Sequence, residues 1–184
     1  MTATTPAMRQ ADDKPPPAEP CASAAIDVVV EAAVWRAEPA AETAVTRAIA
    51  AAADAVGEAA DVAVLLTDDD HIRILNRDFR KLDKATNVLS FPAAPAMAAP
   101  AAIPDVPRFL GDIAIAFETT QREASAEGKP LAHHVSHLAV HGFLHLVGYD
   151  HESHAEAEAM EALERRILAR LGIPDPYASC DGEH

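Results

Sequence analysis

The chain has 184 residues, a length that suits one domain whose buried core needs no disulfide support. It carries 15 Lys and Arg against 29 Asp and Glu, which gives a formal net charge of −14. So acidic a protein is not expected to bind nucleic acid non-specifically, and an RNA or DNA substrate would require locally gathered basic residues.

Residues 1–24 are rich in Ala, Pro, Thr and Asp, and we expect them to form a flexible N-terminal extension. The pattern then predicts a strand at 26–31 and an alanine-rich helix at 41–56, which Gly57 ends. The next strand, at 61–67, is apolar almost throughout, which predicts a central place in a sheet.

Three adjacent aspartates, Asp68, Asp69 and Asp70, precede a short helix that we expect to run to about residue 79. Neighbouring carboxylates can hold a metal ion. At a helix start, however, they more often cap backbone amides and complement the helix dipole, and this is the interpretation we favour.

Positive charge is concentrated in this helix and just after it. Five of the 15 Lys and Arg residues fall within twelve positions, and they are Arg73, Arg77, Arg80, Lys81 and Lys84. Such a run is often only a solvated face, but in so acidic a chain its concentration favours the binding of an anion.

The middle of the chain alternates strands with loops and a helix. A short strand is predicted at 86–91, followed by a loop at 92–107 that is rich in Ala and contains five prolines. A further strand is predicted at 110–117 and a polar helix at 118–127, which Gly128 ends.

The next helix, which Pro130 opens, carries His141 and His145 four residues apart. That spacing stacks two side chains on one helix face, about 5–6 Å apart. Gly148 can then adopt the left-handed conformation that ends a helix, so that His151 can return to the same point. Three neutral imidazoles with a fourth position left to water are typical of a catalytic zinc site. We therefore expect one Zn²⁺ per chain on these three histidines.

The histidines before this group are harder to assign. His137 lies one helical turn before His141 and could either orient a metal ligand or bond to the backbone. We expect His133 and His134 to be exposed. The last helix is predicted to run to about residue 171, with a buried stripe made of Met160, Leu163, Ile167 and Leu171.

The spacing His-x₃-His-x₅-His also matches the metal frame of the metzincin proteases. Those enzymes need Glu directly after the first His as the general base, and here that position is Gly142. Because glycine has no side chain to move a proton, a metallopeptidase is disfavoured.

Four segments resemble the YbeY family of bacterial endoribonucleases and ribosomal RNA maturation factors in sequence, order and spacing. The resemblance covers about residues 26–177. The segments are 75–80 (Leu-Asn-Arg-Asp-Phe-Arg), 86–92 (Thr-Asn-Val-Leu-Ser-Phe-Pro), 110–113 (Leu-Gly-Asp-Ile) and 141–151 (His-Gly-Phe-Leu-His-Leu-Val-Gly-Tyr-Asp-His). Two features depart from the family: Asn87 stands where Asp is common, and the loop at 92–107 is unusually rich in Ala and Pro.

The resemblance implies a single α/β (α+β) domain with about four strands in a mixed sheet and several helices. The zinc site would lie on a helix of the C-terminal half and the turn that follows it, with His141, His145 and His151 as ligands and Arg80 as a functional residue. The implied activity is zinc-dependent cleavage of single-stranded RNA, in maturation of the 3′ end of small-subunit ribosomal RNA and in ribosome quality control. The implied partners are ribosomal RNA, the small subunit and its assembly factors, without DNA or a membrane.

For such a reaction we expect Arg80 to clamp a phosphate through its planar guanidinium, a geometry that lysine lacks. Attack by an activated water and attack by the neighbouring 2′-hydroxyl both remain open. Asp150 is a candidate general base but is equally plausible as a turn residue or as a partner of His151, so we leave it out of the catalytic set. The main alternative is a zinc-containing ribosome-assembly factor with little catalytic activity.

The remaining features indicate cellular context and domain limits. Cys21 and Cys180 lie near opposite ends and are expected to be free thiols. No stretch approaches the roughly 20 apolar residues of a membrane span, and the N-terminus does not resemble a signal peptide, so we expect a soluble, cytoplasmic protein. We assign residues 25–177 to the domain and 178–184 to a C-terminal tail.

Overall fold

The computed structural model describes residues 25–58, 60–93, 108–150 and 153–178, and it shows a single α+β domain. Its sheet has four strands in the order β1-β2-β4-β3, with bounds β1 Ile26–Val30, β2 Ala60–Thr67, β3 Val88–Pro92 and β4 Arg108–Ala116. β1 pairs with β2 and β2 pairs with β4 in parallel, whereas β3 pairs with β4 antiparallel. The predicted mixed sheet and the central place of the second strand are therefore confirmed.

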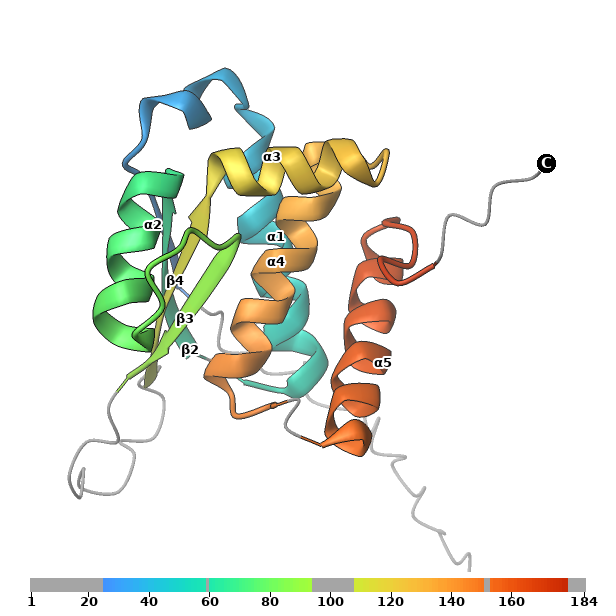
Figure 1. Cartoon of the computed structure of the whole chain (residues 1–184). Helices are drawn as coiled ribbons and strands as arrows, with labels where there is room; N and C mark the ends of the chain where they lie inside the picture. The colour runs from blue at the N-terminus through green and yellow to red at the C-terminus, as the bar shows by residue number, and fades with distance from the viewer. Residues whose placement is uncertain (1–24, 59, 94–107, 151–152, 179–184) are drawn as a thin grey trace, which may run out of the picture.

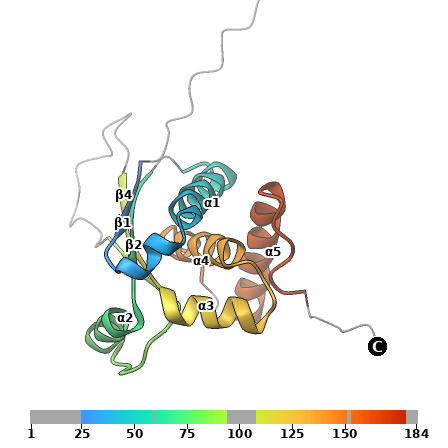
Figure 2. The ribbon, with the colours of Figure 1, turned by 90° about the horizontal axis from the view of Figure 1, so that it is seen from above.

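Within the described residues, five α-helices accompany the sheet, and their bounds are α1 Ala40–Val56, α2 Asp69–Leu75, α3 Phe117–Ala126, α4 Leu131–Leu146 and α5 His154–Arg170. A short 3₁₀ helix spans Ala33–Ala37, and a π-helical turn, Asn76–Arg80, extends α2. Figures 1 and 2 show α2 on one side of the sheet and α1, α4 and α5 on the other. No helix in these described stretches is long and apolar enough to cross a bilayer.

Helix α4 lies between the sheet and α5 (Figures 1 and 2), which explains why its sequence is apolar on more than one side. Phe143 and Leu144 are fully buried, as is Ile113 on β4. Fully burying such a side chain contributes about 1.5–3 kcal/mol each. The chain thus places α4 in the main core and holds the face that carries the histidines at a fixed position beside the sheet.

The aspartates at the start of α2 cap two helices. The Asp68 carboxylate accepts a hydrogen bond from the backbone N–H of His71 in the first turn of α2. The Asp69 carboxylate accepts from both the backbone N–H and the hydroxyl of Thr119 in the first turn of α3. The interpretation of this acidic run as helix caps is therefore confirmed for two of its three members.

Candidate active site

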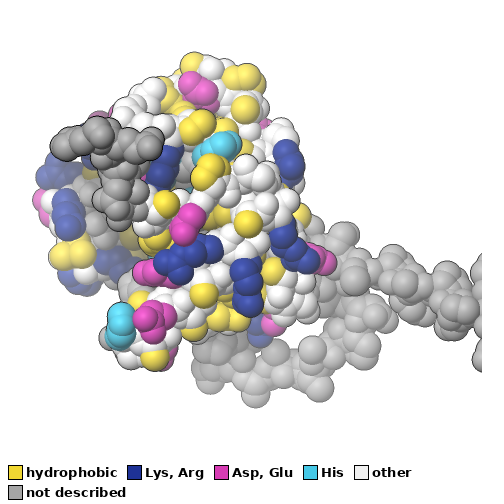
Figure 3. Space-filling view, turned by 90° about the vertical axis from the view of Figure 1, so that its right-hand side faces the viewer, with side chains coloured by type: hydrophobic (Ala, Val, Ile, Leu, Met, Phe, Trp, Pro, Cys, Tyr) yellow, Lys and Arg dark blue, Asp and Glu magenta, His cyan; other side chains and the backbone are white. Residues whose placement is uncertain are grey.

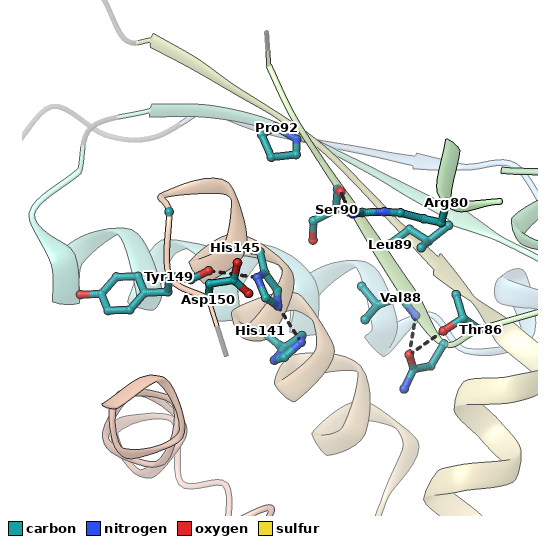
Figure 4. A pocket seen from close by; sticks show the side chains of 12 residues that line it. Arg80, Thr86, Val88, Leu89, Ser90, Pro92, His141, His145, Tyr149 and Asp150 are labelled. Atoms are coloured by element: carbon teal, nitrogen blue, oxygen red, sulfur yellow. Dashed lines mark hydrogen bonds between the residues drawn. The ribbon is translucent and has the colours of Figure 1, made fainter. Parts of the chain in front are cut away.

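A pocket of about 580 Å³ opens between the edge strand β3 and the C-terminal end of α4 (Figure 4). It brings Arg80 together with His141 and His145, which lie more than sixty positions away in the sequence. The other lining residues come from β3 and the segment before it and from the turn after α4, and they are Thr86, Asn87, Val88, Leu89, Ser90, Pro92, Gly148, Tyr149 and Asp150. Two of the three predicted metal ligands and the predicted functional arginine therefore face one cavity.

The rings of His141 and His145 meet through their Nε2 atoms, which are 3.2 Å apart. The Nδ1 atom of His141 lies 2.8 Å from Glu164 Oε1, and that of His145 lies 3.0 Å from the carbonyl oxygen of Tyr149. Because both of these partners are acceptors, each neutral ring carries its hydrogen on Nδ1, and the two Nε2 lone pairs face each other.

This arrangement fits a shared cation. Two imidazole nitrogens that bind one tetrahedral zinc at about 2.0–2.1 Å would stand about 3.3–3.4 Å apart, close to the observed separation. Hydrogen bonding of the opposite ring nitrogen to a carboxylate or carbonyl is also what metal-ligating histidines commonly show. The chemistry of the donors and their spacing therefore fit zinc.

The turn that would supply the third ligand begins as predicted. Gly148 follows the end of α4 and has a φ of 94°, in the left-handed region where glycine is favoured. His151 lies outside the described residues. Within the described ranges, no group of three His, Cys, Asp or Glu side chains is arranged to hold a metal ion.

A buried carboxylate, Glu164 of α5, contacts His141 at Nδ1, the ring nitrogen that does not face His145. Its side chain is fully buried and accepts hydrogen bonds from His141 Nδ1 at 2.8 Å, from His137 Nε2 at 3.3 Å and from the hydroxyl of Tyr177. Burial alone would raise the pKa of Glu164, but the hydrogen bonds from His137, His141 and Tyr177 outweigh it and hold the pKa at about 2. Glu164 is therefore ionised at neutral pH and fixes the ring of His141.

Sequence reasoning missed Glu164. The available signal was its position, because it falls between Met160 and Ile167 on the buried face of α5, where a charged side chain needs partners. The open question about His137 is also answered in part. Among the described residues, its Nε2 atom contacts the side chains of Glu164 and Tyr177 rather than a backbone group.

The expected exposure of His134 and His133 is wrong. His134 is only 6% exposed, and its Nε2 lies 2.9 Å from Glu123 of α3, while His133 is half-buried. The Glu123 carboxylate also accepts from the side-chain amide of Asn87 at 2.9 Å. Because α3 packs against the N-terminal half of α4, a position that would be exposed on an isolated helix becomes an interior one.

The arginines of the basic cluster differ in their partners. Arg73 pairs with Asp83 at 2.7 Å and Arg77 pairs with Asp78 at 2.8 Å, so much of the positive charge predicted for this face is neutralised locally. Arg80 instead donates from Nη2 to the carbonyl oxygen of Ser90 at 3.0 Å. Its guanidinium is thereby anchored to the edge of β3 at the rim of the pocket (Figure 4).

Gly142, directly after the first histidine, packs against the sheet. A Cβ atom at this position would lie 3.0 Å from Ile113 Cγ2 and 3.1 Å from Ser90 Oγ. The Ser90 hydroxyl donates to the carbonyl oxygen of Gly142 at 3.1 Å. At the position that carries the general base in metzincins, even a Cβ atom would therefore require the Ile113 and Ser90 side chains to shift by a few tenths of an ångström.

The family model and the relatives that match this chain in sequence share one description. A family model described as "Endoribonuclease YbeY" matches residues 31–172. A Rhodopseudomonas palustris (strain CGA009) protein named Endoribonuclease YbeY is 65% identical over 159 residues, which cover 84% of this chain and 82% of the relative. A Bradyrhizobium diazoefficiens protein of the same name is 58% identical over 168 residues, covering 86% and 87%.

A solved structure is similar in fold. The solution structure of TM1509 from Thermotoga maritima superposes with a TM-score of 0.50 at 22% identity, over 86% of this chain and 99% of that one. At this identity the likeness shows the fold alone.

Proposed function

The chain belongs to the YbeY family of endoribonucleases, and from that premise we propose that it is a zinc-dependent enzyme that cleaves single-stranded RNA. The observation that carries the proposal is the meeting of Arg80 with the histidine pair in one pocket. An RNA phosphodiester needs a cationic group that holds its phosphate and a site that activates the attacking oxygen, and this pocket offers residues for both.

The metal would be held by His141, His145 and, on the basis of the family resemblance, His151. Zinc at this site supplies Lewis-acid chemistry, which polarises phosphoryl oxygens and activates water. Glu164 acts as a positioning residue, since its hydrogen bond keeps the hydrogen of His141 on Nδ1 and leaves the Nε2 lone pair to bind the metal. The Tyr149 carbonyl does the same for His145.

Arg80 would bind the phosphate. Its bond to Ser90 fixes the guanidinium at the pocket rim and uses one of the five N–H donors that an arginine side chain carries. In a pocket with His141 and His145, the remaining donors suit a bidentate contact with phosphate oxygens. Its contribution is to place the scissile bond and to stabilise negative charge that develops on the phosphate.

The biological reaction we propose is processing of the 3′ end of small-subunit ribosomal RNA, together with a part in ribosome quality control. The supporting observation is family membership, with relatives at about 60% identity over most of the chain that carry the name Endoribonuclease YbeY. On this proposal the partners are ribosomal RNA, the small subunit and its assembly factors, in the cytoplasm.

The test is cleavage of single-stranded RNA by the purified full chain with and without a chelator. We expect cleavage to stop on chelation, to return when zinc is added back, and to be absent from the His141→Ala, His145→Ala, His151→Ala triple variant. Elemental analysis should find one zinc per chain in the wild type, and much less in His141→Ala or His145→Ala. Full zinc occupancy without cleavage would favour the assembly-factor alternative, and full cleavage in chelator would refute zinc dependence.

A further inference from the structure

The outer edge of β3 faces the pocket, and its hydrogen-bonding groups can be assigned one by one. β3 is the last strand of the sheet and pairs with β4. The backbone N–H of Ala93 donates to Leu110 at 2.7 Å, and that of Ala116 donates to the carbonyl of Asn87 at 2.9 Å. In an antiparallel pair, residues alternate between bonding to the partner strand and pointing away from it. Positions 87, 89, 91 and 93 therefore bond to β4, and the N–H and C=O groups of 88, 90 and 92 point outward.

Most of the outward donors are already engaged or absent. The N–H of Val88 donates to the side-chain oxygen of Asn87 at 2.7 Å. Pro92 has no N–H to offer. The N–H of Ser90 is therefore the one outward donor of β3 that lacks an acceptor among the described residues.

This donor stands directly beside Arg80. The N–H and C=O of one residue in an antiparallel strand point the same way, and the C=O of Ser90 is the group that holds the Arg80 guanidinium. Ser90 and Arg80 both line the pocket that contains His141 and His145 (Figure 4). A fixed backbone donor and a guanidinium thus converge on one space, which is an arrangement that binds an anionic oxygen.

We propose that the backbone N–H of Ser90 and the guanidinium of Arg80 together hold the non-bridging oxygens of the RNA phosphate that is cleaved. This inference rests on the proposed function. The same edge is unsuited to an added peptide strand, because such a strand needs alternating free donors and acceptors, and Asn87, Arg80 and Pro92 occupy or remove three of them. A phosphate needs only the donors that remain.

The test compares two substitutions at one position. Ser90→Pro removes the N–H, and proline is tolerated at an edge strand where the N–H points away from the partner. Ser90→Ala is the matched control, since it loses the same hydroxyl bond to Gly142 but keeps the N–H. In the zinc-loaded full chain we expect kcat/KM for single-stranded RNA to be tenfold or more lower in Ser90→Pro than in Ser90→Ala, with equal zinc content and similar melting temperatures. Equal kcat/KM values would overturn the inference.

A second measurement covers the case in which Ser90→Pro does not fold. In the zinc-loaded wild-type chain, the NMR signal of the Ser90 amide proton is followed while an oligoribonucleotide is added. This oligoribonucleotide carries 2′-deoxyribose at the scissile position and is first shown to stay intact with the chain. We expect a downfield shift of this signal that is absent for the Val88 amide, whose acceptor is Asn87. If the Arg80 Nε–H signal moves and the Ser90 signal does not, this inference is refuted and the proposed function stands. A wild-type chain that neither binds nor cleaves RNA would instead refute the proposed function.

Discussion

At the scale of single residues, Arg80 differs from the other arginines of its helix in what its guanidinium contacts. Arg77 is paired with a neighbouring carboxylate, whereas Arg80 is anchored to a backbone carbonyl at the pocket rim. We predict that Arg80→Ala retains zinc and melting temperature but loses tenfold or more in RNA cleavage, because a charge-assisted contact is worth about 1.5–3 kcal/mol. Arg80→Lys should recover only part of the rate, since the charge returns without the planar fork.

Arg77→Ala is the matched control for this prediction. It removes an arginine from the same helix without touching the pocket, and its cleavage rate should stay close to that of the wild type. Rates measured below saturating RNA that are unchanged in Arg80→Ala would remove this residue from the site.

Glu164 should strengthen zinc binding by holding the ring of His141. Glu164→Gln keeps the size of the side chain but removes the charge that three hydrogen bonds converge on. We expect the affinity for zinc, measured by competition with a chelator, to fall by about 10–100-fold, the usual cost of losing the partner of a metal-ligating histidine. Tyr177→Phe, which leaves the His141 bond in place, should cost less. Equal zinc affinities in the wild type and Glu164→Gln would show that Glu164 has no part in positioning His141.

These residues also show which parts of the site the sequence could predict. The spacing of His141 and His145 is a local property of one helix, so their approach to each other could be predicted. The contact of Glu164 with His141 depends on how α5 packs against α4, and the pairing of Arg77 with Asp78 depends on a choice among side-chain conformations. Neither contact can be predicted from the spacing of residues in the sequence. For this reason Glu164 was missed, and the net positive charge around Arg77 was overestimated.

At the scale of elements, the close packing of α4 on the sheet rests on Gly142. Alanine is a better helix former than glycine by about 1 kcal/mol, but its Cβ would press on the fully buried Ile113. We predict that Gly142→Ala lowers the free energy of unfolding by about 1 kcal/mol net, since overpacking a core costs about 1–3 kcal/mol. Gly142→Glu should fail to fold rather than create a peptidase, because its carboxylate would be buried without a partner. Denaturant unfolding of both variants measures this, and a folded, stable Gly142→Glu would contradict it.

The elements themselves were largely predictable, but their arrangement was not. The apolar run of β2 predicted a central strand, and Gly57 and Gly148 marked helix ends where the structure has left-handed glycines. The antiparallel placement of β3 at the edge, beside α4, depends on contacts between residues far apart in the sequence. That placement creates the pocket and decides which backbone N–H and C=O groups of β3 point away from β4. Neither feature could be predicted from the sequence.

At the scale of the whole molecule, the first question is how much of the chain the fold needs. The described contacts begin at Ala25, whose N–H bonds to Asp61 and whose carbonyl accepts from Val62. We predict that deletion of residues 1–24 leaves zinc content unchanged and the melting temperature within a few degrees, because the segment has little apolar surface to bury. A loss of several degrees would show that part of the segment docks on the domain.

Charge is distributed over the molecule in a way that points to the pocket as the place for an anion. On the side where α5 lies, basic and acidic side chains are interspersed (Figure 3). There Arg165 pairs with Glu161 and Asp175, and Arg170 pairs with Asp54. Among the described residues, Arg73, Arg77, Arg122, Lys129, Arg165 and Arg170 form ion pairs with carboxylates. Arg80 forms none there, and it lines the pocket that contains His141 and His145.

Zinc should stabilise the whole domain, since its ligands come together only when α4 and the turn after it are folded. A ligand at 100 times its dissociation constant adds about 2.7 kcal/mol to the free energy of unfolding if it binds only the folded state. For a domain of this size that corresponds to a rise in melting temperature of about 5–10 °C. We predict such a rise when zinc is added to the metal-free chain at pH 7.5, and no comparable rise in His141→Ala.

The zinc-induced rise in melting temperature should depend on pH. Imidazole takes up a proton near pH 6.5, and a protonated ring cannot ligate a metal, so protons compete with zinc for the folded site. The zinc-induced rise should therefore be largest above about pH 7 and shrink steadily as the pH falls to 5, while the melting temperature of the metal-free chain sets the baseline at each pH. A rise that is the same at pH 5 and pH 7.5, or that is the same size in His141→Ala as in the wild type, would show that zinc stabilises the protein somewhere other than at the histidine pair.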